Sequence, residues 1–228
     1  LGYVKTATDC KDLDTLVCPF DKNKVFCSSP FHDKSCEVGD TLYSDKKCYS
    51  IVPTEAIAIG VVFDAENRLA VALDETKTSW ASYNGGYDVD IPTLENCDRE
   101  SLSSCAPSGK NNTSVILTYG KANGIEYSAA EYCNKYKTVG TQSGDWFLPS
   151  TAELLILSAN YSVVNAKLID LGKALSTNTV YLSNYGSSSE YDKKSCWRIN
   201  LKEGSGSYWD KYNSYSTYYI IVRPVLAF

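Results

Sequence analysis

The sequence has no methionine and only one histidine, His32, and none of its cysteines stand in a C-x-x-C pair. A zinc site would need closely spaced cysteine pairs or further histidines. Calcium needs clustered oxygen ligands, which Asp145 in GDWF and Asp210 in YWDKYN do not supply. We therefore expect no metal and no cofactor. The missing methionine also leads us to expect that a signal peptide or anchor has been removed.

Runs of basic residues are missing as well. The net charge is −5 and the isoelectric point is about 5.0, whereas nucleic-acid binding needs a basic face. No Lys/Arg-rich run is present that could dock on anionic lipid. No apolar run approaches the roughly 20 residues of a membrane span. We expect no nucleic-acid partner, and membrane contact only through a removed anchor.

The motifs of common catalytic sites are also lacking. The sequence has no G-x-S-x-G nucleophile elbow and no glycine-rich phosphate loop. The base of a hydrolase could only be His32, which lies in the cysteine-rich start of the chain. We expect that the protein is not an enzyme.

Nine cysteines without a metal-binding spacing indicate disulfides, and therefore an oxidising compartment outside the cell or on its surface. Cys97 and Cys105 lie near enough in the sequence to close a short ring. The odd count leaves one thiol free or paired outside the chain. The pairing stays open for the five N-terminal cysteines, which are Cys10, Cys18, Cys27, Cys36 and Cys48.

The pattern of the chain predicts an α+β fold in which a cysteine-rich N-terminal cap, residues 1–50, precedes a domain over residues 51–228. Apolar runs at 57–63 and 69–73 flank the turn-like DAEN and predict a hairpin. Helices are predicted over 113–124, 128–137, from 150 onward and over 163–171. Strands are predicted over 179–183, 195–201 and 218–228.

Particular residues support these elements. Ser128 with Glu131, and Ser150 with Glu153, have the spacing of capping boxes at two of the helix starts. Trp146 and Trp197 lie within apolar or alternating stretches, so we expect both rings in the core.

The stretch EYCNKYKTVGTQSGDWFLPSTAELLIL contains a YC pair, a glycine-containing spacer and W-x-L-P-[ST]-x-x-E-L, and the chain ends in VRPVLAF. These motifs resemble the C-type-lectin-like superfamily, in the branch of formylglycine-generating-enzyme-like domains and bacterial lectin-fold ligand-binding domains. The ending is similar to the last strand in variable proteins of diversity-generating retroelements and their gut-bacterial relatives. The resemblance covers about residues 113–228.

Two other activities of the superfamily, calcium-dependent sugar binding and oxidation of the formylglycine-generating type, are not expected for this chain. The EPN or QPD triplet and the WND strand of calcium-dependent lectins are absent. Oxidation of the formylglycine-generating type uses neighbouring cysteines near the C-terminus, whereas only Cys196 follows Cys133 here. We expect instead that Cys196 bridges Cys133 and ties a helix to a strand.

Tyrosine is concentrated near the end of the chain, since eight of the 18 tyrosines lie in residues 181–228. Tyrosine together with serine and asparagine is typical of binding loops. The resemblance implies an exposed, diversified binding face over about 181–219. The expected contact residues are Tyr185, Tyr191, Asp192, Tyr208, Trp209, Asp210, Tyr212, Asn213, Tyr215 and Tyr218. The alternative is that these tyrosines are ordinary exposed strand and loop residues.

We therefore expect a non-catalytic bacterial protein, secreted or anchored at the cell surface, that binds a protein or glycan on another cell or host surface. The alternative is a structural or tip subunit of a pilus or surface fibre. The leader sequence encoded by the natural gene would distinguish the binder from the fibre subunit. A lipobox or plain signal peptide favours the free-standing binder, and a pilin-type leader favours the fibre.

Overall fold

The computed structural model describes residues 33–82, 86–98, 101–176, 184–212 and 219–228. The helices are α1 (Gly109–Asn123), α2 (Ser128–Lys135), α3 (Thr151–Ala159) and α4 (Tyr161–Asp170), with a short 3-10 helix, η2 (Leu102–Ser104). The strands are β1 (Asp33–Lys34), β2 (Thr41–Tyr43), β3 (Cys48–Tyr49), β4 (Ala58–Asp64), β5 (Leu69–Ala72), β6 (Thr76–Thr78), β7 (Trp146–Phe147), β8 (Asn184–Glu190), β9 (Ser195–Asn200), β10 (Ser205–Asp210), β11 (Ile220–Val222) and β12 (Val225–Ala227).

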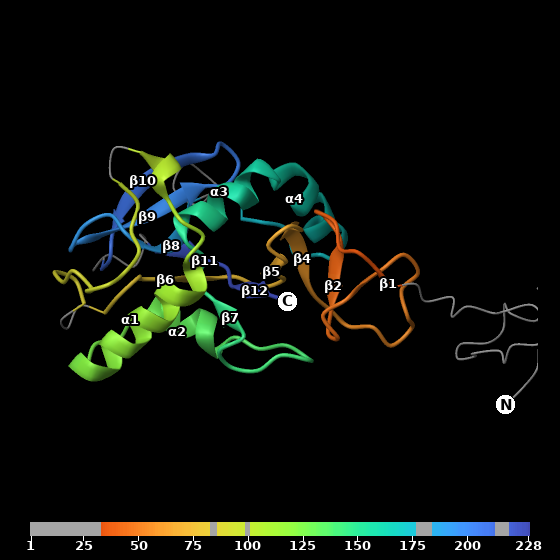
Figure 1. Ribbon diagram of the computed structural model, residues 1–228, viewed down its shortest axis with the longest axis horizontal. Coiled ribbons are helices and arrows are strands. Elements are labelled where there is room, and N and C mark those ends of the chain that lie inside the picture. The colour runs from red at the N-terminus through yellow and green to blue at the C-terminus, as the bar shows by residue number, and fades with distance from the viewer. Residues whose placement is uncertain (1–32, 83–85, 99–100, 177–183, 213–218) are drawn as a thin grey trace, which may run out of the picture.

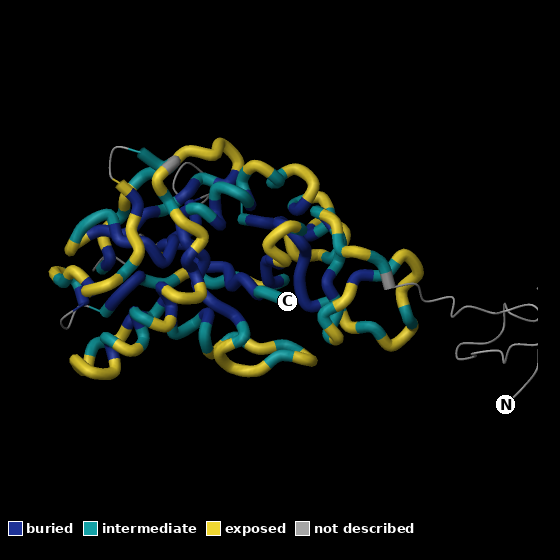
Figure 2. The backbone as a smooth tube through the Cα atoms, viewed as in Figure 1, coloured by how far each residue is buried: buried dark blue, intermediate teal, exposed yellow. Residues whose placement is uncertain are grey.

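Two five-stranded sheets form the body of the molecule, in the orders β10-β9-β8-β11-β6 and β2-β4-β5-β12-β7. Figure 1 shows α3 and α4 on one side of the strands and α1 and α2 on the other. The inner strands between them are buried, and exposed residues gather in the loops, along β10 and on the outer surfaces of the helices (Figure 2). The α+β class is therefore confirmed. Within the described ranges, no helix is long and apolar enough to cross a bilayer.

The hairpin predicted around DAEN is formed by β4 and β5, which pair antiparallel. Nearly every residue of both strands is buried, which explains their continuous apolar runs. In the turn, Asp64 accepts hydrogen bonds from the backbone and side-chain amides of Asn67 at 3.0 and 2.8 Å. These bonds are typical of an aspartate-led turn.

One of the two predicted capping boxes forms. The Ser150 side chain and the Glu153 carboxylate cap the start of α3 reciprocally, and Glu153 also accepts the Gly109 N–H of α1 at 3.3 Å. The prediction for Ser128 is wrong because α2 begins at Ser128 itself, with Tyr127 as the N-cap residue. The Ser128 hydroxyl donates instead to Glu126 at 3.3 Å.

The ends of α1 and α4 lie close to the predicted ends at 124 and 171. α1 is followed by Gly124, with φ of 67°, and α4 is followed after Leu171 by Gly172, with φ of 71°. A left-handed residue of this kind commonly closes a helix. α1 begins earlier than predicted, at Gly109.

The C-terminal run, predicted as one strand, forms two strands in different sheets. β11 lies parallel to β8 and antiparallel to β6, whereas β12 pairs with β5 and β7. Arg223 stands between them, and its guanidinium donates to the carbonyl oxygens of Leu73 at 2.6 Å and Lys173 at 2.8 Å. These bonds hold the chain where it passes from one sheet to the other.

Three apolar clusters fill the interior. The first packs α3 and α4 on both sheets and contains Ile221 and Val225. The second lies under α1 and α2 and contains Ile220 and Val222, and the third contains Trp146. Trp146 and Trp197 are 0% and 5% exposed, so the prediction that both rings are buried is confirmed.

Part of the segment expected as a separate cap belongs to the main body. β2 pairs antiparallel with β4, so residues from Thr41 onward join the second five-stranded sheet. β1 and β3 form a small sheet beyond β2 (Figure 1), and a disulfide joins Cys36 to Cys48. Residues 1–32, with Cys10, Cys18 and Cys27, lie outside the described residues.

The expected bridge between Cys133 and Cys196 is not formed, and both side chains are buried free thiols. They lie in the same apolar cluster, where a cysteine packs as a small apolar group. Burial raises the pKa of Cys133 well above its usual value and that of Cys196 to about 12. α2 is therefore held against β9 by packing in this cluster and not by a disulfide.

Alkylation should test these two thiols. Because both are buried and protonated at neutral pH, we expect iodoacetamide to leave Cys133 and Cys196 unmodified in the folded protein. Both should be modified after unfolding in urea without reductant, as read from peptide masses. The Cys97–Cys105 peptides provide a control that stays unmodified in both states. A non-reduced peptide that joins Cys133 to Cys196 would contradict the assignment.

Candidate functional site

The candidate site is the hairpin of β9 and β10 at one edge of the first sheet. Among the described strands, β10 pairs with β9 alone, and the register sets Tyr208 opposite Trp197 and Ser207 opposite Arg198. Successive side chains of a strand point to opposite faces, so the hairpin has two different surfaces. We call them the tyrosine face (Tyr191, Trp197, Tyr208) and the arginine face (Asn184, Arg198, Asn200, Ser207, Trp209).

The tyrosine face is a stack of aromatic rings. The rings of Tyr191 and Tyr208 are stacked with centroids 4.7 Å apart, and Tyr191 meets Trp197 edge-on at 4.9 Å. Tyr208 is 57% exposed, and the buried indole N–H of Trp197 has no acceptor among the described residues. The exposed ring supplies an amphipathic contact surface held in place by its neighbours.

The arginine face is built around a cation. The guanidinium carbon of Arg198 lies 4.0 Å from the centroid of the Trp209 ring, and its Nε–H donates to the Ser207 hydroxyl at 2.9 Å. Burial lowers the pKa of Arg198 from its usual value. The ring and the hydroxyl together fix the direction of the guanidinium.

A buried ion pair supports the base of the hairpin. Lys211, which is fully buried, forms an ion pair with Glu190 at the end of β8. Its ammonium also donates to the carbonyl oxygens of Val89 at 2.6 Å and Lys193 at 3.0 Å. Burial raises the pKa of Glu190, and Lys211 acts in the opposite direction. These bonds tie the end of β10 to β8 and to the turn between β8 and β9.

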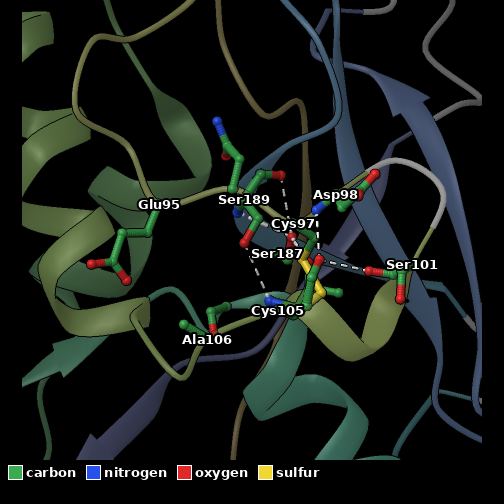
Figure 3. Close-up of a disulfide and its surroundings, with 12 residues drawn as sticks. Glu95, Cys97, Asp98, Ser101, Cys105, Ala106, Ser187 and Ser189 are labelled. Carbon is green, nitrogen blue, oxygen red and sulfur yellow. Dashed lines mark hydrogen bonds between the residues drawn. A yellow bond between two sulfur atoms is a disulfide. The ribbon is translucent and has the colours of Figure 1, made fainter.

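A disulfide loop supports the hairpin from the side of η2. Cys97 is joined to Cys105, the pairing expected for them, and Figure 3 shows the bridge beside Ser187 and Ser189 of β8. Leu102 from this loop covers Gly206 of β10, since a Cβ built at Gly206 would lie 2.8 Å from a Leu102 methyl carbon. The loop therefore holds one face of β10 against the body.

Several of the predicted contact residues are brought together by the structure. Tyr191 and Tyr208 stack, Trp209 is half-buried under Arg198, and Asp210 is exposed at the end of β10. Asp192 closes the β8–β9 turn by accepting the N–H groups of residues 194 and 195 at 2.8 and 2.7 Å.

One further predicted contact residue, Tyr212, follows the end of β10. Tyr212 is half-buried, with its ring centroid 6.4 Å from that of Tyr87. Asn213, Tyr215 and Tyr218 lie outside the described residues, as does the strand predicted over 179–183.

Tyr185 is not on the surface, so its expected exposure is wrong. It is 1% exposed because β8 is an inner strand that points this ring into the first apolar cluster. Its hydroxyl donates to Glu75 at 2.7 Å and accepts the Ser176 N–H at 2.9 Å. A buried tyrosine needs such partners, and the sequence did not reveal them because Glu75 is far away along the chain.

The sequence reasoning missed Arg198, Lys211 and Glu190. The alternation in SCWRIN places Arg198 on the face opposite Trp197, so the sequence does contain a signal for the position of this side chain. Nothing local marks Lys211 as buried, because its partner Glu190 lies across the hairpin. Within the described ranges, no three His, Cys, Asp or Glu side chains gather as metal ligands would. The site offers rings, amides, hydroxyls and a cation, which are groups that bind a polar ligand.

No protein-family model matches the sequence, and no curated protein matches it either. Among solved structures, the fold is similar to that of a fimbrial protein from Bacteroides ovatus, with a TM-score of 0.55 and 17% identity. The match covers 84% of this chain and 49% of that protein, so the chain spans about half of its length.

Two tyrosine substitutions should separate the surface of the hairpin from its core. Tyr208→Ala removes an exposed ring and should change the free energy of unfolding by no more than about 0.5 kcal/mol. Tyr185→Ala removes a buried ring and should cost about 3–5 kcal/mol, as for other large aromatics. Urea denaturation of both variants measures the difference, and equal losses would show that Tyr208 is part of the core.

Breaking the buried ion pair should be costly. Lys211→Met leaves Glu190 buried without its cation, and we expect a loss of about 3–5 kcal/mol in the free energy of unfolding. Lys202→Met, at an exposed turn position, is the matched control and should stay within about 0.5 kcal/mol. Adding Glu190→Gln to Lys211→Met should recover part of the loss. A single-variant loss as small as that of the control would show that the pair does not hold the hairpin.

Proposed function

We propose that this chain is a subunit of a bacterial fimbria or a related surface fibre. The observation that carries the proposal is its similarity in fold, over most of its length, to the Bacteroides ovatus fimbrial protein. The disulfides Cys36–Cys48 and Cys97–Cys105 support a place outside the cell, where such bonds persist.

We further propose that the subunit is not an enzyme and binds a partner through the β9–β10 hairpin. The exposed Tyr208 ring on its Tyr191 support favours this second role, because rigid aromatic anchors contribute strongly to binding surfaces. The partner is a protein or glycan on another cell or host surface. The most specific form of this proposal is that the domain is C-type-lectin-like and that a retroelement diversifies its Tyr/Ser/Asn-rich face.

Immunogold electron microscopy tests the fibre proposal. Antibodies raised against the purified chain should label filaments, along their length or at their tips, on the bacterium that carries the gene. The same strain with the gene deleted is the control and should carry no gold. Gold spread over the cell envelope, with none on filaments, would contradict a fibre subunit and favour a free-standing surface binder.

A further inference from the structure

Arg198 is a half-buried cation for which the described part of the chain provides no acidic partner. Its guanidinium lies over the Trp209 ring and donates its Nε–H to the Ser207 hydroxyl. The two terminal nitrogens of the guanidinium take part in no hydrogen bond or ion pair within the described residues. Four of the five guanidinium N–H donors are therefore available to a ligand.

The other buried cations of the described chain are compensated. Lys211 forms an ion pair with Glu190, and Arg223 lies 3.5 Å from Glu75. Partly removing a charge from water costs free energy unless an opposite charge or hydrogen bonds offset it. In a chain with 27 acidic and 22 basic residues, acids are abundant, yet none of those in the described ranges forms an ion pair with Arg198. An external anion would complete this arrangement.

The strand register places Arg198 between a polar and an apolar neighbour on the arginine face. Ser207 stands opposite on one side. Gly186 stands on the other, and the Ile220 side chain fills the space beside it, since a Cβ built at Gly186 would overlap an Ile220 methyl carbon. The next row of the same face holds Asn184 and Asn200, which pair across β8 and β9. Residues two apart in a strand lie about 7 Å from one another, so one small ligand can span both rows.

The two asparagines have hydrogen-bonding capacity left. Asn184 is only 8% exposed, and no hydrogen bond to its side-chain amide is found among the described residues. Asn200 uses its Oδ1 to accept the N–H groups of Lys202 at 3.1 Å and Glu203 at 3.3 Å. Its NH₂ group is then free to donate toward a ligand.

We propose that the arginine face binds an acidic glycan, with the sugar's carboxylate on the Arg198 guanidinium and its hydroxyls on the amides of Asn184 and Asn200. A guanidinium fork matches a carboxylate in a bidentate way. Amides, a hydroxyl and the Trp209 ring suit a sugar better than they suit an acidic peptide, which would need apolar pockets for its neighbouring side chains. The inference does not depend on the chain's assembly into a fibre.

Nitrogen-15 NMR of the purified full chain, with sialyllactose and lactose as probes, tests the site. The chain has four arginines (Arg68, Arg99, Arg198 and Arg223), and the Nε–Hε signals report on each. Millimolar sialyllactose should shift the Arg198 signal and leave that of Arg223 in place. Lactose, which lacks the carboxylate, should shift neither. A glucuronic-acid disaccharide tests whether the site accepts other acidic sugars.

Two substitutions then test the role of the charge. Arg198→Gln should weaken sialyllactose binding by about tenfold or more, because a hydrogen-bonded charge is lost. Arg68→Gln is the matched control, since Arg68 also lies over an aromatic ring, that of Phe228, at 5.0 Å. The affinity of this variant for sialyllactose should be unchanged. Melting curves for both variants show whether the fold is kept.

Asn200→Asp tests the site if Arg198→Gln fails to fold. Aspartate keeps the oxygen that accepts the two turn N–H groups and places a carboxylate near Arg198, so the variant should fold and lose binding of sialyllactose.

Three results would each overturn the proposal: an Arg198 signal that no acidic sugar moves, equal binding of lactose and sialyllactose, or binding of an aspartate-rich peptide alone. Binding by the isolated chain is independent of the immunogold result, so failure of one proposal is distinguishable from failure of the other.

Discussion

The fold depends on the burial of one short segment, Ile220–Ala227, which supplies a strand to each five-stranded sheet. Five of its apolar side chains are at most 2% exposed, and each such burial contributes about 1.5–3 kcal/mol. The segment takes part in all three apolar clusters. Because Arg223 bonds to carbonyl groups of two separate loops, the passage between the sheets is fixed, and the relative placement of the sheets is fixed with it.

The position of the hairpin follows from this constraint. β11 pairs parallel with β8, and β8 carries β9 and β10 outward to the edge of the sheet. Beyond Gly186, β8 leaves the β9 ladder, and its serines bond to the start of α3 instead, as in the hydrogen bond of 3.0 Å from Thr151 to Ser187. Glu190, at the end of this irregular stretch, is thereby placed to hold Lys211. Among the described strands β10 pairs with β9 alone, and the base of β10 is anchored by the ion pair.

Signals that act over a few residues were readable from the sequence, and those that depend on distant partners were not. The β4–β5 turn, the Ser150–Glu153 box and the glycine helix ends are all determined by neighbours within four residues. Tyr185 shares its residue type with Tyr208, yet one is core and the other surface, because the position of a strand within its sheet decides exposure. The thiols of Cys133 and Cys196 likewise lie in one cluster without bonding, a distinction that spacing cannot make.

The proposed fibre contacts and the proposed glycan site make different demands on the surface. In Figure 1 the β9–β10 hairpin and the β1–β3 sheet lie toward opposite ends of the longest axis. Subunit contacts are stabilised by apolar burial or by strand addition. A two-fold contact through the arginine face would instead bring Arg198 of both copies together, and like charges at an interface are costly. The hairpin is therefore unsuited to self-association of that kind. The Arg198 cation on this face is better explained by a ligand that is not another copy of the chain.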